Sequence, residues 1–584
     1  MKKIKISTII LITILVIYSI ISFYKLGNTK NPQTFAEVNE GEQIKFQIES
    51  DKVIEYAMIY SANNESNFSV FYSDDESFED YIYDSYFEIE YDHVFQWNQV
   101  YINNSGIQSK YIMLQSNMSP STLGEIKFFD IEKNEVEVSP IDENAKLLLD
   151  EQSYIPENYT YLNSSYFDEI YFPRASYEIL HNKAIFEYVH PPLGKLINSI
   201  PIYFFGLTPF SYRLCGNIAG ILMILIIYLI AKEIFSRERY ALFAALIMAL
   251  DGMHFVQTRI GTVDSQLVLF SLISFLFFIK FIKIPALEDI KKKIKPLIFS
   301  GIFFGLAVSV KWTAMFVGLG MAIIYFTKFI LNKKFDYKLI LWSILSYIII
   351  PLFIYIACYI PIINNPNSEI YYQHLDKNGN EVEEYVHIND IKSFIKYQRA
   401  MYEYHSELVD THPYSSPWYT WPIMKRPLWF YISRFDDGKV GTIACMGNPA
   451  IWWLTIPTAI FTLVHTIITI IRNMKNKKYQ ISKSGAIIIT MIATTWLSYY
   501  FIGRIMFIYH YFITIPFMML TIVYTINVLA KWKIKIDYIM PVLSLIFLGF
   551  FIYFYPIYSG KPVSIEYIQR TEWLRSWDYD GLPK

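Results

Sequence analysis

The apolar residues of this chain are grouped in blocks of about 20 residues that are separated by short polar stretches. A helix needs about 20 predominantly apolar residues to cross the hydrocarbon core of a bilayer. By this length the sequence predicts an α-helical polytopic membrane protein with about 11 transmembrane helices. The first predicted span ends near Tyr24, and the others are residues 212–234, 240–253, 266–281, 296–310, 314–330, 339–360, 451–471, 486–502, 505–529 and 539–555.

Lysine and arginine are concentrated in every second loop between the predicted spans. Cytoplasmic loops of membrane proteins carry such an excess, so the pattern predicts that these loops and the N-terminus face inside and that the C-terminal segment lies outside. A cleaved signal peptide is the alternative for the first apolar run, but that run is long and no small-residue cleavage site follows it. The protein is therefore predicted to be a multi-pass protein of the cell membrane. The basic loops are residues 236–239, 291–295, 328–334, 472–483 and 531–535.

Two long segments, residues 27–211 and 364–448, are predicted to lie outside. In the first, short alternating runs such as Gln43–Ile48 and Tyr111–Leu114 are separated by acidic and Asn/Ser clusters, which is typical of β-strands. A stretch of this length suffices for a small β-sandwich. Residues 110–114 and 124–130 resemble the late strands of jelly-roll carbohydrate-binding domains, and a spacer or an acceptor-docking domain is the alternative.

These patterns divide the chain into seven parts. They are transmembrane helix 1 (1–26), an extracytoplasmic β-rich domain (27–150), a first outer loop with interfacial helices (151–211), transmembrane helices 2–7 (212–360), a second large outer loop (361–448), transmembrane helices 8–11 (449–556) and an extracytoplasmic C-terminal tail (557–584).

The composition agrees with a membrane protein, because 53% of the residues are hydrophobic and 18% are charged. A soluble chain carries nearer a quarter of charged residues. The net charge of −2 says little about partners, because the two signs are segregated along the chain, and no nucleic-acid partner is predicted. The three cysteines, Cys215, Cys358 and Cys445, have no spacing that indicates a metal site or a disulfide.

Two adjacent carboxylates, Asp168 and Glu169, lie among aromatic residues in the first outer loop. An apolar environment raises the pKa of a carboxyl group and suits it to proton transfer. Adjacent side chains point in different directions on a helix or strand. We therefore expect one carboxylate to face the reaction and the other to hold structure or a ligand; a solvated acidic pair is the alternative.

Further polar clusters lie at the predicted outer edges of the membrane. In His190-Pro-Pro-Leu-Gly-Lys195 the double proline forbids a helix interior. Lys195 then begins a helix along the interface, where a lysine often only reaches toward headgroups. Arg213 opens the second span, and a membrane-edge arginine usually has a partner. The other clusters are Asp251 with Arg259 and Asp264-Ser265, Lys311-Trp312, Tyr404-His405, His412–Trp418, Lys425-Arg426-Pro427, Asn448, and Arg504 with Tyr509-His510-Tyr511.

All of these clusters are predicted to be outside, whereas the inner loops offer mainly Lys and Arg. Nucleotide-activated sugars are absent outside, so the location favours an enzyme that uses a polyprenyl-phosphate-linked sugar as donor. Cationic side chains suit the donor phosphate, and a carboxylate suits activation of a hydroxyl. The candidate phosphate-binding residues are Lys195, Arg213, Arg426 and Arg504.

Taken in order along the chain, these residues resemble the protein O-mannosyltransferase family, glycosyltransferase family 39, which has a GT-C type fold. The match runs from about Ser165 to Tyr511 and consists of several blocks. They are Asp168-Glu169, His190–Lys195, Arg213, Arg259 to Ser265, Lys311-Trp312, His412–Trp418 with Arg426-Pro427, Gly447-Asn448-Pro449 and Tyr509-His510-Tyr511.

The resemblance implies inverting transfer of a sugar, typically mannose, from a polyprenyl-phosphate carrier to Ser or Thr hydroxyls of exported proteins. It implies that Asp168 is the general base, that Glu169 positions it or binds a ligand, and that Arg213 and Lys195 hold the carrier phosphate. Arg426 and the His412 loop would close the donor site. Substrate contacts are implied for His190, Arg259, Asp264, Lys311, Trp312, His412, Asn448 and His510.

The sequence leaves open whether the enzyme uses a metal cofactor and which acceptor it modifies. A divalent metal could assist through Glu169 or Asp264, but the sequence has no dedicated metal cluster. Unlike eukaryotic members of the family, the chain has too short a second outer segment for a β-trefoil domain, and it has an extra domain before Asp168. A lipid or cell-wall glycan acceptor is therefore the alternative. A transporter or receptor is less favoured, because neither mid-bilayer ionisable groups nor repeated halves are seen.

Overall fold

The computed structural model describes residues 5–285, 288–332, 336–375, 379–408, 410–475, 483–532 and 538–579. Parts of the predicted basic loops 328–334, 472–483 and 531–535 lie outside the described residues. The chain forms two compact units. Unit 1, which is mainly helical, consists of residues 1–24, 181–198 and 213–584, and unit 2, which contains a β-sandwich, consists of residues 25–180 and 199–212.

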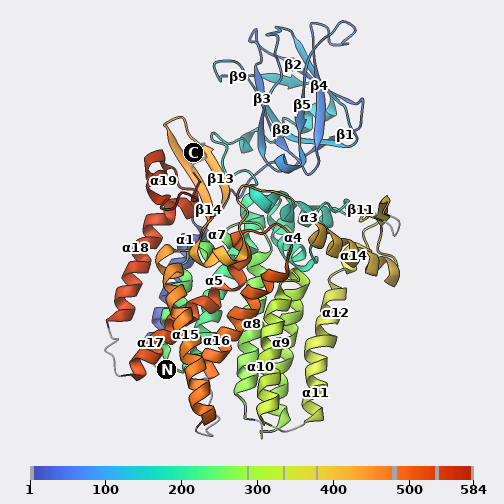
Figure 1. The fold of residues 1–584 in the computed structure, drawn as a ribbon. Helices are drawn as coiled ribbons and strands as arrows, with labels where there is room; N and C mark the ends of the chain where they lie inside the picture. The colour runs from blue at the N-terminus through green and yellow to red at the C-terminus, as the bar shows by residue number, and fades with distance from the viewer. Residues whose placement is uncertain are drawn as a thin grey trace. The chain divides into compact units, whose positions relative to one another are not determined.

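Unit 1 is a bundle of long helices with short strands and helices at one end (Figure 1). Its helices are α1 (Ile6–Phe23), α4 (Leu193–Phe205, which begins in unit 1), α5 (Pro209–Phe235), α6 (Glu238–Ala249), α7 (Gly252–Gln257), α8 (Asp264–Lys283), α9 (Ile290–Val310), α10 (Ala314–Asn332), α11 (Tyr337–Ile344), α12 (Ile350–Ala357), α13 (Ile360–Ile363), α14 (Ile391–Glu407), α15 (Pro449–Lys475), α16 (Lys483–Trp496), α17 (Ile515–Lys531), α18 (Ile539–Ser559) and α19 (Ile565–Thr571). Its strands are β11 (Ile370–Leu375), β12 (Glu381–Val386), β13 (Leu428–Arg434), β14 (Lys439–Cys445) and β15 (Val563–Ser564).

The prediction of a polytopic helical membrane protein is confirmed. Among the described residues, eight helices are long and apolar enough to cross a membrane, and two shorter apolar helices cover 314–330 and 515–531. The predicted span at 240–253 corresponds to the 12-residue helix α6 and the start of α7. The count of about 11 transmembrane helices therefore stays a prediction.

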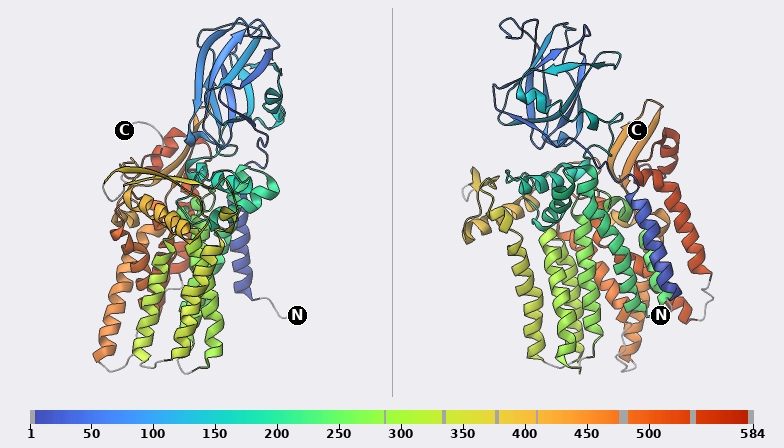
Figure 2. Two further views of the ribbon diagram at one scale, coloured as in Figure 1. Left: turned by 90° about the vertical axis from the view of Figure 1, so that its right-hand side faces the viewer. Right: turned by 180° about the vertical axis from the view of Figure 1, so that it is seen from behind.

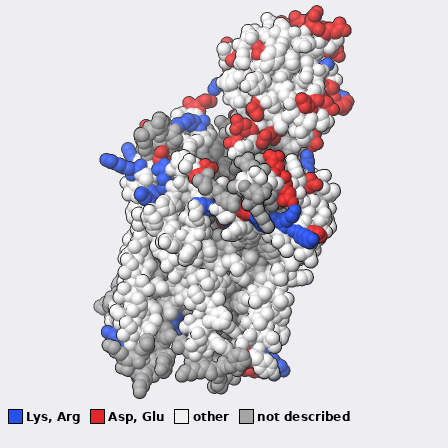
Figure 3. Space-filling view, turned by 45° about the vertical axis from the view of Figure 1, so that its right-hand side comes forward, with Lys and Arg blue, Asp and Glu red and all other residues white. Residues whose placement is uncertain are grey.

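The helices of unit 1 run roughly parallel or antiparallel to one another (Figure 2). On the face drawn in Figure 3, charged side chains are sparse over a broad band of this unit and gather above and below it. Such a band is what a membrane-spanning bundle requires, because each charge in the hydrocarbon costs several kcal/mol.

The order of the helices brings several predicted site residues to one end of the bundle. Helix α8 begins at Asp264 and ends at Lys283, α9 returns from Ile290 to Val310, and Lys311 is its C-cap. Asp264 and Lys311 therefore lie at the same end, and Lys283 and Ile290 lie at the other.

Two glycines let α9 pack closely against its neighbours. A Cβ atom on Gly301 would lie 1.9 Å from the carbonyl oxygen of Ser346, in a π-helical turn (η4, Leu345–Ile349) between α11 and α12. A Cβ atom on Gly305 would lie 2.8 Å from the Cα atom of Pro351 in α12. Small residues at such positions allow membrane helices to approach each other.

Unit 2 contains the predicted β-rich domain, which is confirmed as two antiparallel sheets. One sheet has the order β1-β8-β3-β6, with β9 paired to β8, and the other has the order β10-β2-β7-β4-β5. The strands are β1 (Ala36–Val38), β2 (Gln43–Ile48), β3 (Tyr56–Ser61), β4 (Ser66–Ser73), β5 (Ile82–Ile89), β6 (Trp97–Tyr101), β7 (Tyr111–Ser116), β8 (Ser121–Phe129), β9 (Glu135–Val136) and β10 (Val138–Pro140).

Side chains of the two sheets share one core. Phe46 on β2 and Phe128 on β8 come from opposite sheets, and their ring centroids lie 5.4 Å apart. A second cluster packs Tyr60 and Trp97 with Ile170 and Tyr212, which follow the sandwich in sequence. Residues 151–180 and 199–212 therefore belong to the same compact unit as the sandwich.

Candidate functional site

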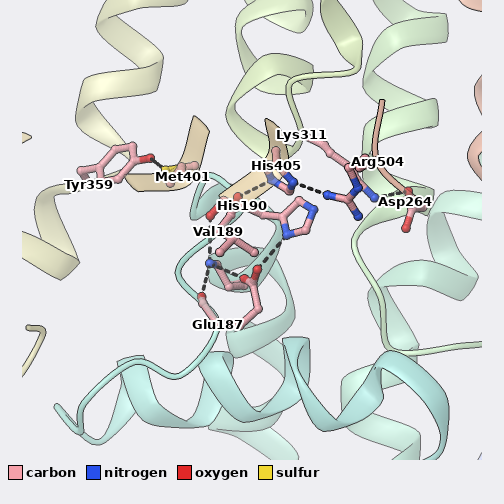
Figure 4. A network of polar contacts seen from close by, with 10 residues as sticks. Glu187, Val189, His190, Asp264, Lys311, Tyr359, Met401, His405 and Arg504 are labelled. Atoms are coloured by element: carbon pink, nitrogen blue, oxygen red, sulfur yellow. Dashed lines mark hydrogen bonds and ion pairs between the residues drawn. The ribbon is translucent and has the colours of Figure 1, made fainter. Parts of the chain in front are cut away.

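A buried salt bridge closes the loop that precedes α4 in unit 1. Lys195 Nζ lies 2.7 Å from Glu187 Oε2, and Glu187 Oε1 lies 2.7 Å from Nδ1 of His190 (Figure 4). The Lys195 ammonium also donates to the carbonyl oxygens of Glu187 (2.6 Å) and His190 (2.9 Å). An ammonium group has three N–H donors, and these three acceptors occupy them. Lys195 therefore ties residues 187–190 to the first turn of α4.

The charges in this loop stabilise each other in a nearly dry environment. Lys195 is 1% exposed and Glu187 is 5% exposed. Burial by itself raises the pKa of Glu187, but the Lys195 ammonium and the His190 ring outweigh that effect and lower the pKa to about 2. Burial lowers the pKa of His190 in spite of Glu187, so its ring is neutral at pH 7.

Two prolines and a glycine at the start of α4 explain how this helix begins and how it packs beside α8. Pro191 and Pro192 stand directly before α4, where missing N–H groups cost nothing. Gly194 follows, and a Cβ atom there would lie 2.5 Å from Cγ1 of Val263. The absence of a side chain at Gly194 therefore lets α4 pack against the residue before Asp264.

A second buried salt bridge joins α8 to the end of α9. Lys311 Nζ lies 3.0 Å from Asp264 Oδ1, and both side chains are almost completely buried. Asp264 stands in the first turn of α8, where the helix dipole favours a carboxylate. The Lys311 ammonium also lies 5.5 Å from the centroid of the Tyr509 ring.

His405, on α14, connects the second outer segment to this network. Its Nε2 atom lies 2.7 Å from the carbonyl oxygen of Val189 and therefore donates to it. Its Nδ1 atom is then free of a proton and accepts from the Arg504 guanidinium. Burial, followed by the nearby His190, Arg504 and Lys311, lowers the pKa of His405 to about 3. The ring is therefore neutral at physiological pH.

Figure 4 shows these groups as one network: His190, His405, Arg504, Lys311 and Asp264 lie close to one another, above Glu187 in that view. The rings of His190 and His405 have centroids 5.0 Å apart. Lys195, Lys311 and Arg504 carry three positive charges, and Glu187 and Asp264 carry two negative ones. Among these five side chains the positive charges exceed the negative ones by one, which suits the single negative charge of a phosphodiester.

Trp312 links this network to α12 and α14. Its Nε1 atom donates to the hydroxyl of Tyr355 at 3.0 Å, and that hydroxyl donates to Oε1 of Gln398 on α14. The ring of Trp312 also lies edge-on to His405, with centroids 6.3 Å apart. His510 stacks on Tyr509 at 4.4 Å and on Trp421 at 6.1 Å, so it forms an aromatic wall beside Lys311.

The adjacent carboxylates Asp168 and Glu169 lie in unit 2, in a short 3-10 helix (η3, Phe167–Ile170). Glu169 is fully buried, and its Oε2 atom accepts a hydrogen bond from the backbone N–H of Tyr166 at 3.2 Å. Asp168 is half-buried. Phe167 has a φ of 51°, a left-handed conformation that is strained for an aromatic residue and typical of functional sites. Glu169 thus holds the turn and Asp168 is more accessible, whereas their predicted roles in catalysis stay predictions.

Two other predicted site residues hold the scaffold together. Arg259 donates to the carbonyl oxygens of Ser22 (3.0 Å) and Tyr24 (2.8 Å), at the end of α1. Asn448 Nδ2 donates to the carbonyl oxygens of Leu250 and Phe547, each at 2.9 Å. Their roles in substrate binding stay predictions.

Figure 4 does not label three more of the predicted residues, Arg213, Arg426 and His412. Arg213 is fully buried in α5. The Arg426 guanidinium lies 5.0 Å from the centroid of the Tyr414 ring, and its buried Nε atom has no hydrogen-bond partner among the described residues. His412 packs on Phe507 at 5.2 Å, and its Nδ1 atom accepts from the Tyr414 N–H. Nothing in these contacts tests the predicted roles in donor binding.

Among the described residues, no group of acidic, His and Cys side chains placed to share an ion includes Glu169 or Asp264. Among the described residues, the acidic, His and Cys side chains close enough to share an ion are Glu125, Asp150 and Glu151 of unit 2, with ligand atoms within 4.8 Å of one another. This group contains neither Glu169 nor Asp264. Burial raises the pKa of Glu125 to about 8, so it is mostly protonated at pH 7 and poorly suited to a cation.

Sequence reasoning missed Glu187 and gave no role to His405. The only sequence signal for Glu187 is a carboxylate three residues before His190, and His405 stands more than 200 residues away in the chain. The buried ion pair of Arg174 and Glu178 on α3 (Phe172–Leu180) was also missed, although its spacing of four residues is typical of helical pairs.

Comparison with known proteins identifies similar chains. Residues 155–364 match the family model described as dolichyl-phosphate-mannose-protein mannosyltransferase, and residues 390–577 match the model of the C-terminal four-transmembrane region of protein O-mannosyltransferase. The polyprenol-phosphate-mannose–protein mannosyltransferase of Mycolicibacterium smegmatis is 23% identical over 467 residues, which cover 70% of this chain and 87% of that protein. The enzyme of that name from Corynebacterium glutamicum is 26% identical over 322 residues, 47% of this chain and 60% of that protein.

The fold is also similar to a solved structure. The Saccharomyces cerevisiae protein O-mannosyltransferase Pmt1–Pmt2 complex bound to the sugar donor superposes with a TM-score of 0.60, at 15% identity, over 71% of this chain and 89% of that chain. This similarity supports the GT-C type architecture. The sandwich strands, residues 36–140, precede the residues matched by both family models.

Proposed function

We propose that this chain, a polyprenyl-phosphate-mannose-dependent protein mannosyltransferase of the protein O-mannosyltransferase family, works at the outer face of the membrane on Ser and Thr hydroxyls of exported proteins. The observation that carries this proposal is the network of Lys311, Arg504, His190 and His405 at one end of the helical bundle. It combines an unbalanced positive charge with neutral rings, which suits a carrier phosphodiester.

Arg504 and Lys311 are the proposed ligands of the carrier phosphate. Arginine can bind two phosphate oxygens with its planar fork, and lysine adds a point charge. Lys195 has its three N–H donors occupied within the loop, so we assign it to positioning His190 rather than to direct contact with the phosphate. Arg213 and Arg426 remain candidates for further contacts with the donor.

The proposed reaction is a single displacement with inversion. The acceptor hydroxyl oxygen forms a bond to C1 of mannose while the bond from C1 to the phosphate oxygen breaks, and the phosphate keeps the electron pair. The hydroxyl proton passes to Asp168, the proposed general base, and Glu169 fixes the turn that carries it. Fixed cations stabilise the charge that develops on the leaving phosphate.

The proposed topology has about 11 transmembrane helices, with the network outside and the basic loops inside. It is supported by the order of α8, α9 and α10, which separates Asp264 and Lys311 from the basic segment at 291–295. Single cysteines at two exposed positions test it in intact cells. A membrane-impermeant maleimide should label Asp437→Cys, in the turn between β13 and β14, and spare Lys292→Cys near the start of α9. Labelling of Lys292→Cys alone would reverse the proposed orientation.

The activity is tested with the purified protein in lipid nanodiscs, polyprenyl-phosphate-linked radiolabelled mannose and a Ser/Thr-rich peptide. We expect the peptide to become radiolabelled, and we expect alkali to release this label by β-elimination. The same carrier loaded with glucose tests the donor sugar. A second candidate function is transfer to a lipid or cell-wall glycan. The observation behind it is the additional β-sandwich. This candidate predicts label in the lipid or glycan fraction and an unlabelled peptide.

A further inference from the structure

The outer face of the sheet β10-β2-β7-β4-β5 carries exposed aromatic rings next to uncharged polar groups. Strands β4 and β5 lie side by side at one edge of this sheet (Figure 1). Their alternation turns Phe68 and Phe87 into the core, and their register places Phe71 opposite Tyr83 and Ser69 opposite Tyr86. Tyr83 and Tyr86 therefore point away from the core, on the free face of the sheet.

The tyrosine side chains at this edge are exposed, and two of them pack against a neighbouring ring. Tyr81, Tyr83 and Tyr86 are 56%, 53% and 63% exposed. The ring of Phe71 contacts both Tyr81 and Tyr83 edge-on, with centroids 5.2 and 5.5 Å apart. Large exposed aromatic groups that cluster in this way mark binding surfaces rather than chance exposure. Because Phe71 holds the Tyr81 and Tyr83 rings in advance, a ligand that stacks on them loses little additional entropy.

A row of amide and hydroxyl groups crosses the strands beside the rings. Gln115 on β7 stands opposite Gln43 on β2 and opposite Ser69 on β4. Asn117 Nδ2 donates to Oδ1 of Asn67 at 2.7 Å, and its Oδ1 atom accepts from Ser69 Oγ at 3.2 Å. Amide groups offer donors and acceptors together, which is what the neighbouring hydroxyl groups of a sugar ring require.

The charge of the sandwich excludes anionic ligands. Residues 36–141 contain 21 Asp and Glu residues against five lysines and no arginine. Acidic side chains are prominent on the β-rich domain in Figure 3. Such a surface repels nucleic acids, phosphate-containing polymers and acidic polysaccharides, and carboxylates can accept hydrogen bonds from hydroxyl groups. A neutral, hydroxyl-rich ligand fits both the rings and the charge.

We propose that this face, formed by Tyr81, Tyr83 and Tyr86 with Ser69, Gln115 and Asn117, binds a neutral oligosaccharide. The C–H groups of a hexose ring stack on the negative faces of Tyr83 and Tyr86. Its hydroxyl groups hydrogen-bond to the amide row. The face would hold a glycan chain independently of mannose transfer, so the proposal does not rest on the proposed function.

Binding to the full-length protein in nanodiscs tests the proposal, with mannotetraose and chitotetraose as neutral probes and oligolysine as a cationic probe. Saturable binding of at least one neutral probe is expected, together with a loss of at least tenfold in the double variant Tyr83→Ala/Tyr86→Ala. Tyr83→Phe/Tyr86→Phe keeps the rings and should keep most of the affinity. Tyr91→Ala, an exposed tyrosine in the 3-10 turn η1 (Tyr91–His93), is the matched control.

Peptide mannosylation by the double alanine variant should equal that of the wild type, which separates this site from the catalytic one and shows that the variant is folded. Three results would overturn the proposal: no neutral probe binds at millimolar concentration, the double alanine variant binds as tightly as the wild type, or oligolysine alone binds to the face.

Discussion

The Lys195 ammonium and the Glu187 carboxylate form a salt bridge of 2.7 Å in which both side chains are almost completely buried. Buried ion pairs contribute little net stability when complete, but removal of one partner leaves an unpaired charge away from water. The pair also fixes His190, the ring that faces His405. We therefore interpret Lys195 and Glu187 as a clamp that shapes one wall of the proposed donor site.

Replacement of Lys195 by Met should lower the free energy of unfolding by about 3–5 kcal/mol, because Glu187 loses its counter-charge. The double variant Glu187→Gln/Lys195→Met should recover part of this loss, since both charges are gone. Thermal unfolding in nanodiscs measures the effect. The matched control is Lys292→Met, from an exposed pair with Glu288, which should leave the free energy of unfolding nearly unchanged. A Lys195→Met protein as stable as the control would refute the clamp.

The two adjacent carboxylates should respond differently to substitution. Asp168→Asn should lower kcat by about 10²–10⁴-fold, because the amide cannot accept the hydroxyl proton. Glu169→Gln keeps an oxygen that can accept the Tyr166 N–H and should be milder, whereas Glu169→Ala should also cost about 1 kcal/mol of stability. Single-turnover transfer and thermal unfolding separate the two effects. Equal kcat for Asp168→Asn and wild type would remove Asp168 as the base.

Stability should fall in mild acid because of His405. Its pKa is about 3 in the folded protein, against an ordinary value of about 6.5. Between these values the unfolded chain binds a proton that the folded protein does not. The free energy of unfolding therefore decreases as the pH falls below about 6.5, by up to about 1.4 kcal/mol per pH unit. Unfolding at several pH values between 7 and 4 should show a shallower slope for His405→Gln, and an unchanged slope would contradict the predicted neutral ring.

Asn448 should matter for stability more than for donor binding. Its amide satisfies two buried carbonyl oxygens, those of Leu250 and Phe547. Each buried polar group left without a partner costs about 1–3 kcal/mol. Asn448→Ala should therefore unfold more easily than the wild type, with the KM for the donor unchanged in the fraction that remains folded. A raised KM with normal stability would instead support the substrate contact implied by the family resemblance.

Much of the architecture can be predicted from short-range patterns of hydrophobic residues along the sequence. Apolar block length predicts the membrane helices, and two-residue alternation predicts the sandwich; both are confirmed at that level. The unlike roles expected for Asp168 and Glu169 also follow from local geometry, because neighbouring side chains cannot point the same way. The number of spans is less predictable, since α6 has only 12 residues and depends on neighbours for its burial.

The contacts that build the site join residues far apart in the sequence, and no local pattern encodes them. His405 meets Val189 and Arg504 across more than 200 and about 100 residues respectively. Glu187 belongs to no motif that the sequence analysis recognised, yet it holds both Lys195 and His190. The sequence marks Asn448 and Arg259 as polar groups beside apolar blocks, but it does not show that their amide and guanidinium groups bind distant backbone carbonyl oxygens. Their roles in substrate binding stay predictions.

The central claim is that Arg504 and Lys311 bind the phosphate of the carrier. Equilibrium binding of polyprenyl phosphate to the purified protein in nanodiscs tests it most directly, with Arg504→Gln against the control Lys292→Met. Loss of one charge-assisted contact of about 1.5–3 kcal/mol predicts that Arg504→Gln binds about 10–150-fold more weakly, while the control binds as the wild type does. Equal affinity of folded Arg504→Gln and wild type would contradict the assignment of this network to the donor phosphate.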